Sequence, residues 1–348
     1  MTDRMALYSV ERVPVLQNRV FATTAEARDC VRGDVRLVQD PTTGLVFNEA
    51  FDASLVKYDR HYNNEQGLSP AFDRHLDDVS RIVLEWLGTT DLLEVGCGKA
   101  AFLERLAARG CRIEGCDPTY EGSSPHVIRE FYGRDLGYRG KNIVLRHVLE
   151  HIPDPVGFLQ MVADANGGGR IYIEVPCFDW ILAHRAWFDI FYEHVNYFRL
   201  TDLERMFGTV HASGRIFGGQ YLYVVAELAT VRLPRSADAP IDFPPDFLGT
   251  LAGPCLSPDD VIWGAASKGV IYALLRERLG CPAAVAVDVN PAKQGMHLPG
   301  TGLEILSPEH CLARIPPGRR VCVMNSNYLD EIRDMTTDRY TYEAIDDA

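Results

Sequence analysis

Residues 91–117 carry the glycines and carboxylates that could hold a nucleoside. The segment DLLEVGCGKAAFLERLAARGCRIEGCD reads as a buried strand, a glycine turn, a helix and a second strand that ends in Asp117. Gly96 and Gly98 let the backbone approach a ligand without a Cβ clash, and the following helix offers unpaired N–H groups at its start. Asp117 lies 19 positions after Gly98, where a carboxylate can accept both ribose hydroxyls. We therefore expect a nucleoside pocket at this turn.

Two details of the turn favour S-adenosylmethionine over a dinucleotide. The turn GCGKAA lacks the third glycine of the dinucleotide pattern, and Glu94 precedes it on the strand, as in class I methyltransferases. A dinucleotide-binding oxidoreductase and a glycine turn without a ligand are the alternatives. The residues that we expect to contact the cofactor are Glu94, Gly96, Cys97, Gly98, Asp117, Pro118 and His147.

A second polar motif is NIVLRHVLEHIPDP, residues 142–155. We expect a strand whose carboxyl end places His147, Glu150 and His151 at the edge of the sheet, beside the methylsulfonium group. The spacing of the two histidines could bind a metal on a helix. Because prolines at 153 and 155 argue against a helix, we predict no metal at this motif.

The third motif is WFDIFYEHVNYF, residues 187–198, between a predicted strand and the next helix. Tyr192, Glu193 and His194 are adjacent polar groups within an aromatic stretch. Histidine is the side chain whose ordinary pKa suits proton transfer near neutral pH. The motif therefore predicts catalytic groups above the cofactor, although a helix with an aromatic core face and exposed polar residues is the alternative.

Size and composition limit the class of protein. A chain of 348 residues suits two or three domains, and a net charge of -13 argues against a nucleic-acid partner. No apolar run reaches the roughly 18 residues of a membrane span, and the N-terminus has no apolar signal segment. Nine cysteines without a CxxC pair favour reduced thiols and a cytoplasmic location.

The elements that position these motifs form three blocks. Residues 1–78 predict a lid block with a small sheet, made by VRLV and LVFN around the turn PTTG, and a helix that begins near Ser69. Residues 79–236 alternate strands and helices, which predicts a mainly parallel, Rossmann-like α/β sheet. Residues 237–247 read as a linker or exposed loop. Residues 248–348 repeat the alternation and predict a second small Rossmann-like domain.

Together, these motifs resemble the C-methyltransferases that act on nucleotide-linked keto-deoxysugars. The resemblance covers roughly residues 44–335 and is carried by EVGCG, HVLEHIPDP, YEHVNYF, FGGQYL, GAASKG, DVNPAKQGMHLPGT and NSNYLDEI, in that order. It implies a methyltransferase core, a distinctive C-terminal domain, and His194 as the base that forms an enolate. It further implies that Glu193 orients the base and that His151 and Tyr62 hold substrate oxygens, with Tyr192 beside them.

The sequence departs from this family at the N-terminal zinc knuckle. Asp40 and Thr43 stand near the positions expected for paired cysteines, and Cys30 has no partner in sequence. We therefore predict no structural zinc. The departure leaves open an O-, N- or C-methyltransferase acting on another small natural-product metabolite, and a non-catalytic binding protein. The acceptor is expected to be a small molecule, a nucleotide-linked one by the resemblance, with Lys268 meeting a phosphate.

Overall fold

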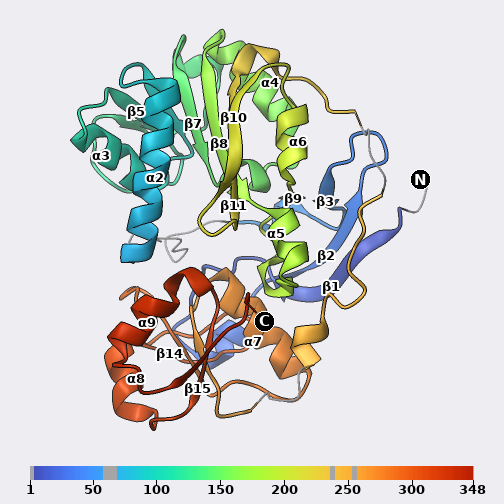
Figure 1. Cartoon of the computed structure of the whole chain (residues 1–348), viewed down its shortest axis with the longest axis vertical. Helices are drawn as coiled ribbons and strands as arrows, with labels where there is room; N and C mark the ends of the chain where they lie inside the picture. Colours follow the sequence, from blue (N-terminus) through green and yellow to red (C-terminus); the bar gives the residue numbers. More distant parts are fainter. Residues whose placement is uncertain (1–3, 58–68, 236–239, 253–256, 348) are drawn as a thin grey trace.

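The computed structural model describes residues 4–57, 69–235, 240–252 and 257–347. Its described strands form a seven-stranded, a five-stranded and a four-stranded sheet. Figure 1 shows the seven-stranded sheet with its helices above the C-terminal α/β unit, and the N-terminal strands to one side of both. This arrangement confirms the predicted α/β class, with a Rossmann-like core and a second small Rossmann-like unit.

The central sheet has the strand order β10-β11-β8-β7-β4-β5-β6. Strands β4 to β8 pair in parallel, whereas β11 pairs antiparallel with both β8 and β10. The chain proceeds outward from β4 on one side and then returns to β7 on the other, so the strand order reverses between these two strands. Such a reversal opens a crevice at the carboxyl ends of the strands, where ligands of doubly wound sheets bind. The strands are β4 (Leu92–Val95), β5 (Ile113–Cys116), β6 (Val127–Ile128), β7 (Asn142–Arg146), β8 (Arg170–Pro176), β10 (Val210–Ile216) and β11 (Tyr221–Glu227).

Helix α2 (Pro70–Leu87) begins where the sequence predicts a helix. The Ser69 hydroxyl accepts hydrogen bonds from the N–H groups of Ala71 and Phe72, and Pro70 occupies the first turn. The helix ends at Gly88, whose φ is 79°. Its apolar face packs on the sheet, and the predicted boundary between residues 78 and 79 falls inside it. The other helices of this unit are α3 (Ala101–Ala108), α4 (Pro155–Asn166), α5 (Phe178–Ala183) and α6 (Leu200–Arg205).

The predicted small N-terminal sheet is present, and it also includes a strand from the motif at residues 187–198. Its order is β1 (Ala6–Pro14), β2 (Arg32–Gln39), β3 (Val46–Asn48) and β9 (Asn196–Tyr197). The turn between β2 and β3 is closed by Asp40, whose Oδ1 accepts from the N–H groups of Thr42 and Thr43. A hydrogen-bonded turn therefore occupies the place where the resemblance led us to look for paired cysteines. The pairing of β3 with β9 fixes the position of the segment that contains His194.

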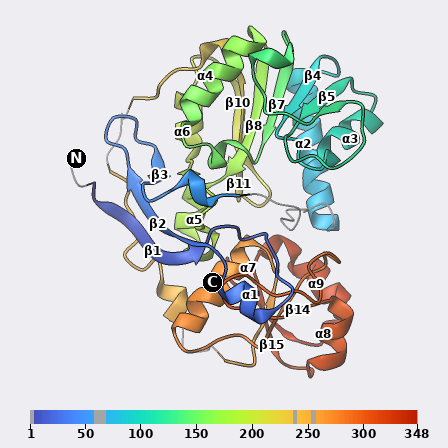
Figure 2. The same cartoon turned by 180° about the vertical axis from the view of Figure 1, so that it is seen from behind.

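The C-terminal unit is a five-stranded parallel sheet in the order β14-β13-β12-β15-β16. Helix α1 (Thr24–Arg28) lies against this unit (Figure 2), and the Thr24 hydroxyl donates to the carbonyl of Gly302 at 3.3 Å. The N-terminal block therefore contacts both α/β units. The elements of the C-terminal unit are β12 (Val261–Trp263), α7 (Ser267–Arg278), β13 (Val285–Val287), β14 (Ile305–Leu306), α8 (Pro308–Arg314), β15 (Arg320–Val323), α9 (Leu329–Met335) and β16 (Thr341–Ala344).

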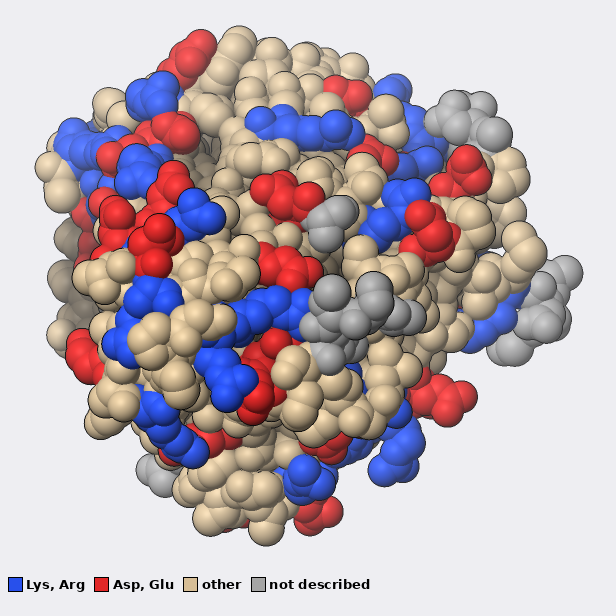
Figure 3. All heavy atoms as spheres, turned by 60° about the horizontal axis from the view of Figure 1, so that its bottom comes forward, with Lys and Arg blue, Asp and Glu red and all other residues tan. Residues whose placement is uncertain are grey.

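The surface charge and the predicted linker at residues 237–247 can be compared with the expectations from the sequence. Figure 3 shows basic and acidic side chains interspersed on the face that it presents, without a broad basic field. In the described ranges, no helix is long and apolar enough to cross a membrane. The predicted linker is not wholly exposed, because Phe247 is buried and the rings of Phe243 and Phe247 pack on Tyr8.

Candidate functional site

The glycine turn after β4 has the geometry of a ligand-binding turn. Gly96 has φ 74°, and a Cβ there would lie 2.4 Å from Val148, so this glycine lets the turn pack against the loop after β7. Gly98 has φ 53°, and a Cβ there would meet nothing within 4 Å. The Gly98 N–H donates to Oδ2 of Asp117 at 2.8 Å, and Oδ1 of Asp117 accepts from the N–H of Thr119. Asp117 thus stabilises the glycine turn, and its Oδ2 can accept a further hydrogen bond from a ligand.

Glu94 provides a test of whether these residues fit the cofactor. Its side chain is 3% exposed, and its Oε2 has no hydrogen-bond partner among the described residues. Burial raises the pKa of Glu94 to about 8, against the opposing charge of Arg146. An unpartnered buried carboxyl beside a glycine turn suits the ammonium group of a methionine moiety. The residues present therefore fit S-adenosylmethionine.

Cys97 and Pro118 make smaller contributions at this turn. Cys97 is buried, and burial raises the pKa of its thiol, so it is a poor nucleophile. Its sulfur would lie 2.9 Å from a Cβ at Gly115, which shows that the thiol packs against β5. Pro118 is exposed directly after Asp117. A contact of either residue with the cofactor stays a prediction.

Cofactor binding should release a proton from Glu94. With its pKa raised to about 8, Glu94 is mostly neutral at pH 7 in the free protein, and a nearby ammonium group favours the charged form. We expect S-adenosylhomocysteine affinity to increase as the pH rises from 6 to 8, and calorimetry in buffers of different ionisation enthalpy to show proton release at pH 7. Glu94→Gln should bind without that release. Equal proton release by both proteins would contradict the assignment.

Glu174, near the carboxyl end of β8, is the shared hydrogen-bond partner of three other side chains and was not predicted as a site residue. It is fully buried and bonded to His75 Nε2 at 2.8 Å, Arg146 Nε at 2.9 Å and His147 Nε2 at 3.1 Å. Burial opposes its charge, but Arg146 and the two histidines hold the pKa of Glu174 well below its ordinary value. The signal in sequence was an acidic residue at the end of a predicted strand that runs beside the HVLEH strand.

His147 lies between two buried carboxylates. Its Nε2 contacts Glu174, and its Nδ1 lies 3.4 Å from Oε1 of Glu150. Burial opposes protonation, but these two carboxylates raise the pKa of His147 to about 9. Its φ of 51° is unusual for a residue with a side chain. His147 is therefore a charged residue held in a strained turn at the carboxyl end of β7.

The pKa of His147 predicts how stability depends on pH. A histidine whose pKa rises from about 6.5 in the unfolded chain to about 9 in the folded protein stabilises the fold fully below pH 6.5. That contribution is lost as the pH rises to 9. We expect the free energy of unfolding in urea to fall between pH 6.5 and 9, and His147→Asn to flatten this slope. An unchanged slope in the variant would contradict the proposed ion pairs.

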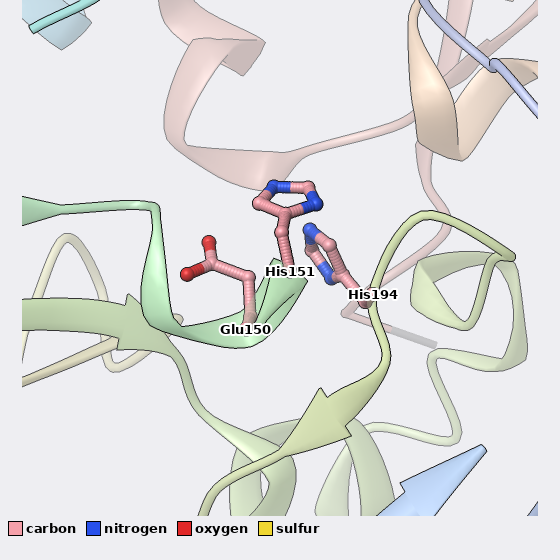
Figure 4. Close-up of side chains that lie close together, drawn as sticks. All are labelled: Glu150, His151 and His194. Carbon is pink, nitrogen blue, oxygen red and sulfur yellow. The ribbon is translucent and has the colours of Figure 1, made fainter. Parts of the chain in front are cut away.

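A cleft of about 240 Å³ lies between the central sheet and the C-terminal unit. The central unit contributes the loop after β7 and the segment before β9, and the C-terminal unit contributes the start of α7, the end of β13 and α9. Figure 4 shows Glu150 and His151 on one ribbon segment, with the ring of His194 next to that of His151. The lining residues used below are Glu150, His151, Asp189, Glu193, His194, Lys268, Asp288 and Lys293.

His194 has the environment of a neutral imidazole. It is 8% exposed and its ring packs 4.0 Å from the ring of Phe191 and 5.0 Å from that of His151. Burial, followed by the positive charges of His151, His147 and Lys268, holds the pKa of His194 well below its ordinary value. The sequence predicted a base with a pKa near neutrality. In the structure His194 is instead a base with a lowered pKa, so its nitrogen lone pair is available at neutral pH. Once His194 accepts a proton, its positive charge needs a nearby negative charge.

His151 and Glu193 are neighbours, although not in the predicted way. His151 Nδ1 lies 2.8 Å from the backbone carbonyl of Glu193, to which it can donate, leaving Nε2 as an acceptor. The Glu193 carboxylate accepts from the backbone N–H of Gln17 at 2.9 Å. Glu193 thus orients His151 through its backbone, and its side chain binds the N-terminal segment.

Two predicted tyrosines cannot be placed in the cleft. Tyr192 is fully buried, and its hydroxyl is bonded to the backbone N–H and carbonyl of Asp52, at 2.8 and 3.2 Å. This prediction is corrected: Tyr192 anchors the N-terminal block and is absent from the cleft lining, because its ring packs against Phe51 and its hydroxyl is held by Asp52. Tyr62 lies outside the described residues.

Glu150, His151 and His194 could also approach a common cation, since one ligand atom from each lies within 4.8 Å of the others. Two histidines and a carboxylate are a known set for divalent metals. His147 also lies beside Glu150, with its Nδ1 3.4 Å from Oε1. The expectation of no metal stays a prediction.

Comparison with known proteins supports the cofactor assignment. A family model described as a methyltransferase domain matches residues 57–210, which include the glycine turn, the HVLEH motif and the segment of His194. The C-methyltransferase NovU of Streptomyces niveus is 24% identical over 322 residues, covering 79% of this chain and 76% of NovU. The chain is an S-adenosylmethionine-dependent methyltransferase.

Solved structures that resemble part of this methyltransferase include the PH0226 protein of Pyrococcus horikoshii OT3, at 12% identity and TM-score 0.39, covering 51% of this chain and 100% of that one. Magnesium protoporphyrin IX methyltransferase of Synechocystis PCC 6803 with bound SAM is 14% identical, with TM-score 0.33 and coverage of 47% and 80%. The N-methyltransferase NodS of Bradyrhizobium japonicum WM9 is 19% identical, with TM-score 0.32 and coverage of 46% and 97%.

Proposed function

We propose that this methyltransferase C-methylates a keto-deoxysugar linked to a nucleotide, through an enolate formed by His194. The observation that supports this most directly is the position of His194 in a cleft shared by the cofactor-binding unit and the C-terminal unit. The similarity to the C-methyltransferase NovU favours carbon as the methylated atom.

The chemistry requires a base, a donor for the developing oxyanion and an electrophile. S-adenosylmethionine supplies an electrophilic methyl group when bound. His194 accepts the proton from the carbon next to the ketone, and the electron pair of that C–H bond moves into the enolate. When protonated, His151 can donate a hydrogen bond from Nε2 to the enolate oxygen. A C–C bond would then form between the enolate carbon and the methyl group as the S–CH3 bond breaks, with the electron pair of that bond kept by the sulfur of S-adenosylhomocysteine. The proton on His194 then passes to solvent.

The C-terminal unit offers a place for the nucleotide end of the acceptor. Its turn between β12 and α7 repeats the arrangement at the cofactor turn, since the Ala265 N–H donates to Oδ2 of Asp288 at 3.0 Å. Lys268 lies at the start of α7, but its ammonium is paired with Asp189 at 3.1 Å and Gln220 at 3.0 Å. A phosphate at this position would have to compete with these partners, so we place the nucleoside, rather than the phosphates, at this turn.

The test uses S-adenosylmethionine carrying a ¹³C-labelled methyl group and a panel of nucleotide-linked 4-keto-deoxysugars. The expected product gains one methyl group by mass and shows a carbon-bonded methyl in ¹H–¹³C correlation spectra. A methyl bonded to oxygen or nitrogen would instead favour the alternative small-metabolite methyltransferase. No product from any sugar, in a protein that binds S-adenosylhomocysteine, would contradict the proposed acceptor.

A further inference from the structure

Glu150 is a buried carboxylate beside the cleft that takes no part in the proton transfer described above. It follows β7 directly, in the single turn Leu149–His151, and is 1% exposed. Neither of its carboxylate oxygens has a hydrogen-bond partner in the part of the chain that the structure describes. A buried unpartnered carboxylate costs free energy, so a role in the working enzyme is expected.

The other carboxylates at this edge of the cleft already have donors. Glu174 is bonded to Arg146, His147 and His75. Asp189 pairs with Lys268 at 3.1 Å, and the Glu193 carboxylate accepts from the backbone of Gln17. Glu150 has the ion pair with His147, at 3.4 Å, and retains unsatisfied oxygens.

Glu150 also lies next to the imidazole that must gain a charge. One carboxylate oxygen of Glu150 lies within 4.8 Å of a ring nitrogen of His194 and of one of His151 (Figure 4). The interactions that lower the pKa of His194 after burial come from His151, His147 and Lys268, all side chains that are positive when protonated. Without a nearby anion, moving a proton to His194 would place another positive charge among these cations.

We propose that the Glu150 carboxylate is the counter-ion for the positive charge that forms on His194 when it accepts the α-proton. The inference rests on the proposed function, since it assigns Glu150 a role in the same proton transfer. Glu150 acts through His194 and touches no reacting atom, so it is a positioning residue. The ion pair with His147 engages Oε1 at 3.4 Å, and the carboxylate keeps acceptor capacity for a second cation when the proton arrives at His194.

The experiment measures protonation of His194 directly and does not require the acceptor. Protein with ¹⁵N-labelled histidine, saturated with S-adenosylhomocysteine, is titrated by ¹H–¹⁵N NMR, and the His194 signals are assigned from their loss in His194→Asn. In Glu150→Gln, the midpoint for His194 should fall by about one pH unit or more, the usual effect of removing an opposite charge at this range. Glu150→Asp, which retains the charge, should show a smaller fall.

Asp202→Asn is the matched control, because Asp202 is also fully buried, pairs with Arg199 and Arg205, and is absent from the cleft lining. It should leave the His194 midpoint unchanged. The same midpoint in wild type and Glu150→Gln would overturn the proposal, whether or not a keto sugar is methylated. A shifted midpoint without any C-methylated product would instead refute the proposed function alone.

A cobalt titration tests the competing explanation for the same three side chains. We expect no saturable visible absorption bands when Co²⁺ is added to the wild-type protein. Stoichiometric bands that disappear in Glu150→Gln would show that Glu150, His151 and His194 hold a metal, and would overturn the counter-ion role.

Discussion

Replacing His194 by alanine is expected to abolish detectable methyl transfer while S-adenosylmethionine affinity changes by no more than a few-fold. General-base catalysis contributes roughly 10²–10⁴-fold to a rate. His194 lines the acceptor cleft, and Gly96 and Gly98 are not among the residues of that lining. The measurements are single-turnover transfer of labelled methyl groups and calorimetry with S-adenosylhomocysteine.

His211→Ala is the control for the loss of an imidazole. His211 lies on β10, and its Nε2 is 2.6 Å from Oε1 of Glu227. It is not part of the cleft lining. It should retain the wild-type rate. If His194→Ala turned over as fast as wild type, another group would have to be the base, and the enolate mechanism would need a different assignment.

Replacing Glu174 by alanine is expected to give the largest loss of stability. The change leaves Arg146 and His147, whose side chains are 10% and 21% exposed, beside each other without their shared anion. Removing one partner of a buried ion pair costs about 3–5 kcal/mol. Because the pKa of Glu174 is depressed in the folded protein, its contribution is present above the unfolded pKa of about 4.3 and is lost as the pH falls further. Urea unfolding at pH 7 measures the first effect, and unfolding in wild type and variant from about pH 5 downward, through the unfolded pKa of about 4.3, measures the second.

Glu227→Ala is the comparison for this second experiment. Glu227 lies on the neighbouring strand β11 and pairs with Arg170 and His211, but its side chain is 35% exposed. Half-exposed ion pairs contribute at most about 1 kcal/mol, so Glu227→Ala should unfold close to wild type. Equal losses in the two variants would show that the Glu174 network contributes no more than a surface pair.

The sequence predicted the local units well because each is written in consecutive residues. LLEV followed by Gly96 and Gly98 predicted a strand and a turn, and the structure has β4 and two glycines with positive φ. A helix was predicted to begin near Ser69, and Ser69 is the N-cap of α2. Alternation of such units was enough for the Rossmann-like class.

Errors arose where a side chain could face either of two directions. Tyr192 is adjacent in sequence to Glu193 and His194, but its ring packs against Phe51 and its hydroxyl bonds to Asp52. Nothing in residues 187–198 distinguishes the cleft side from the core side, because the segment is a series of turns between short elements without a helix or strand period.

The cofactor turn could be predicted from the sequence alone. Its glycines and the acid at the end of the next strand belong to one strand–helix–strand unit, where residues close in sequence set the geometry. The tertiary structure decided the chemistry of the acceptor side. His194 meets His151 and Glu150 because the residues on either side of His194 bond to that turn, Val195 N–H to the carbonyl of Glu150 at 2.8 Å and the Glu193 carbonyl to His151 Nδ1 at 2.8 Å. Glu174 meets His75 because α2 packs across β8. These contacts join residues 43 to 99 positions apart, and burial among such distant partners fixes which imidazole is charged and which is neutral.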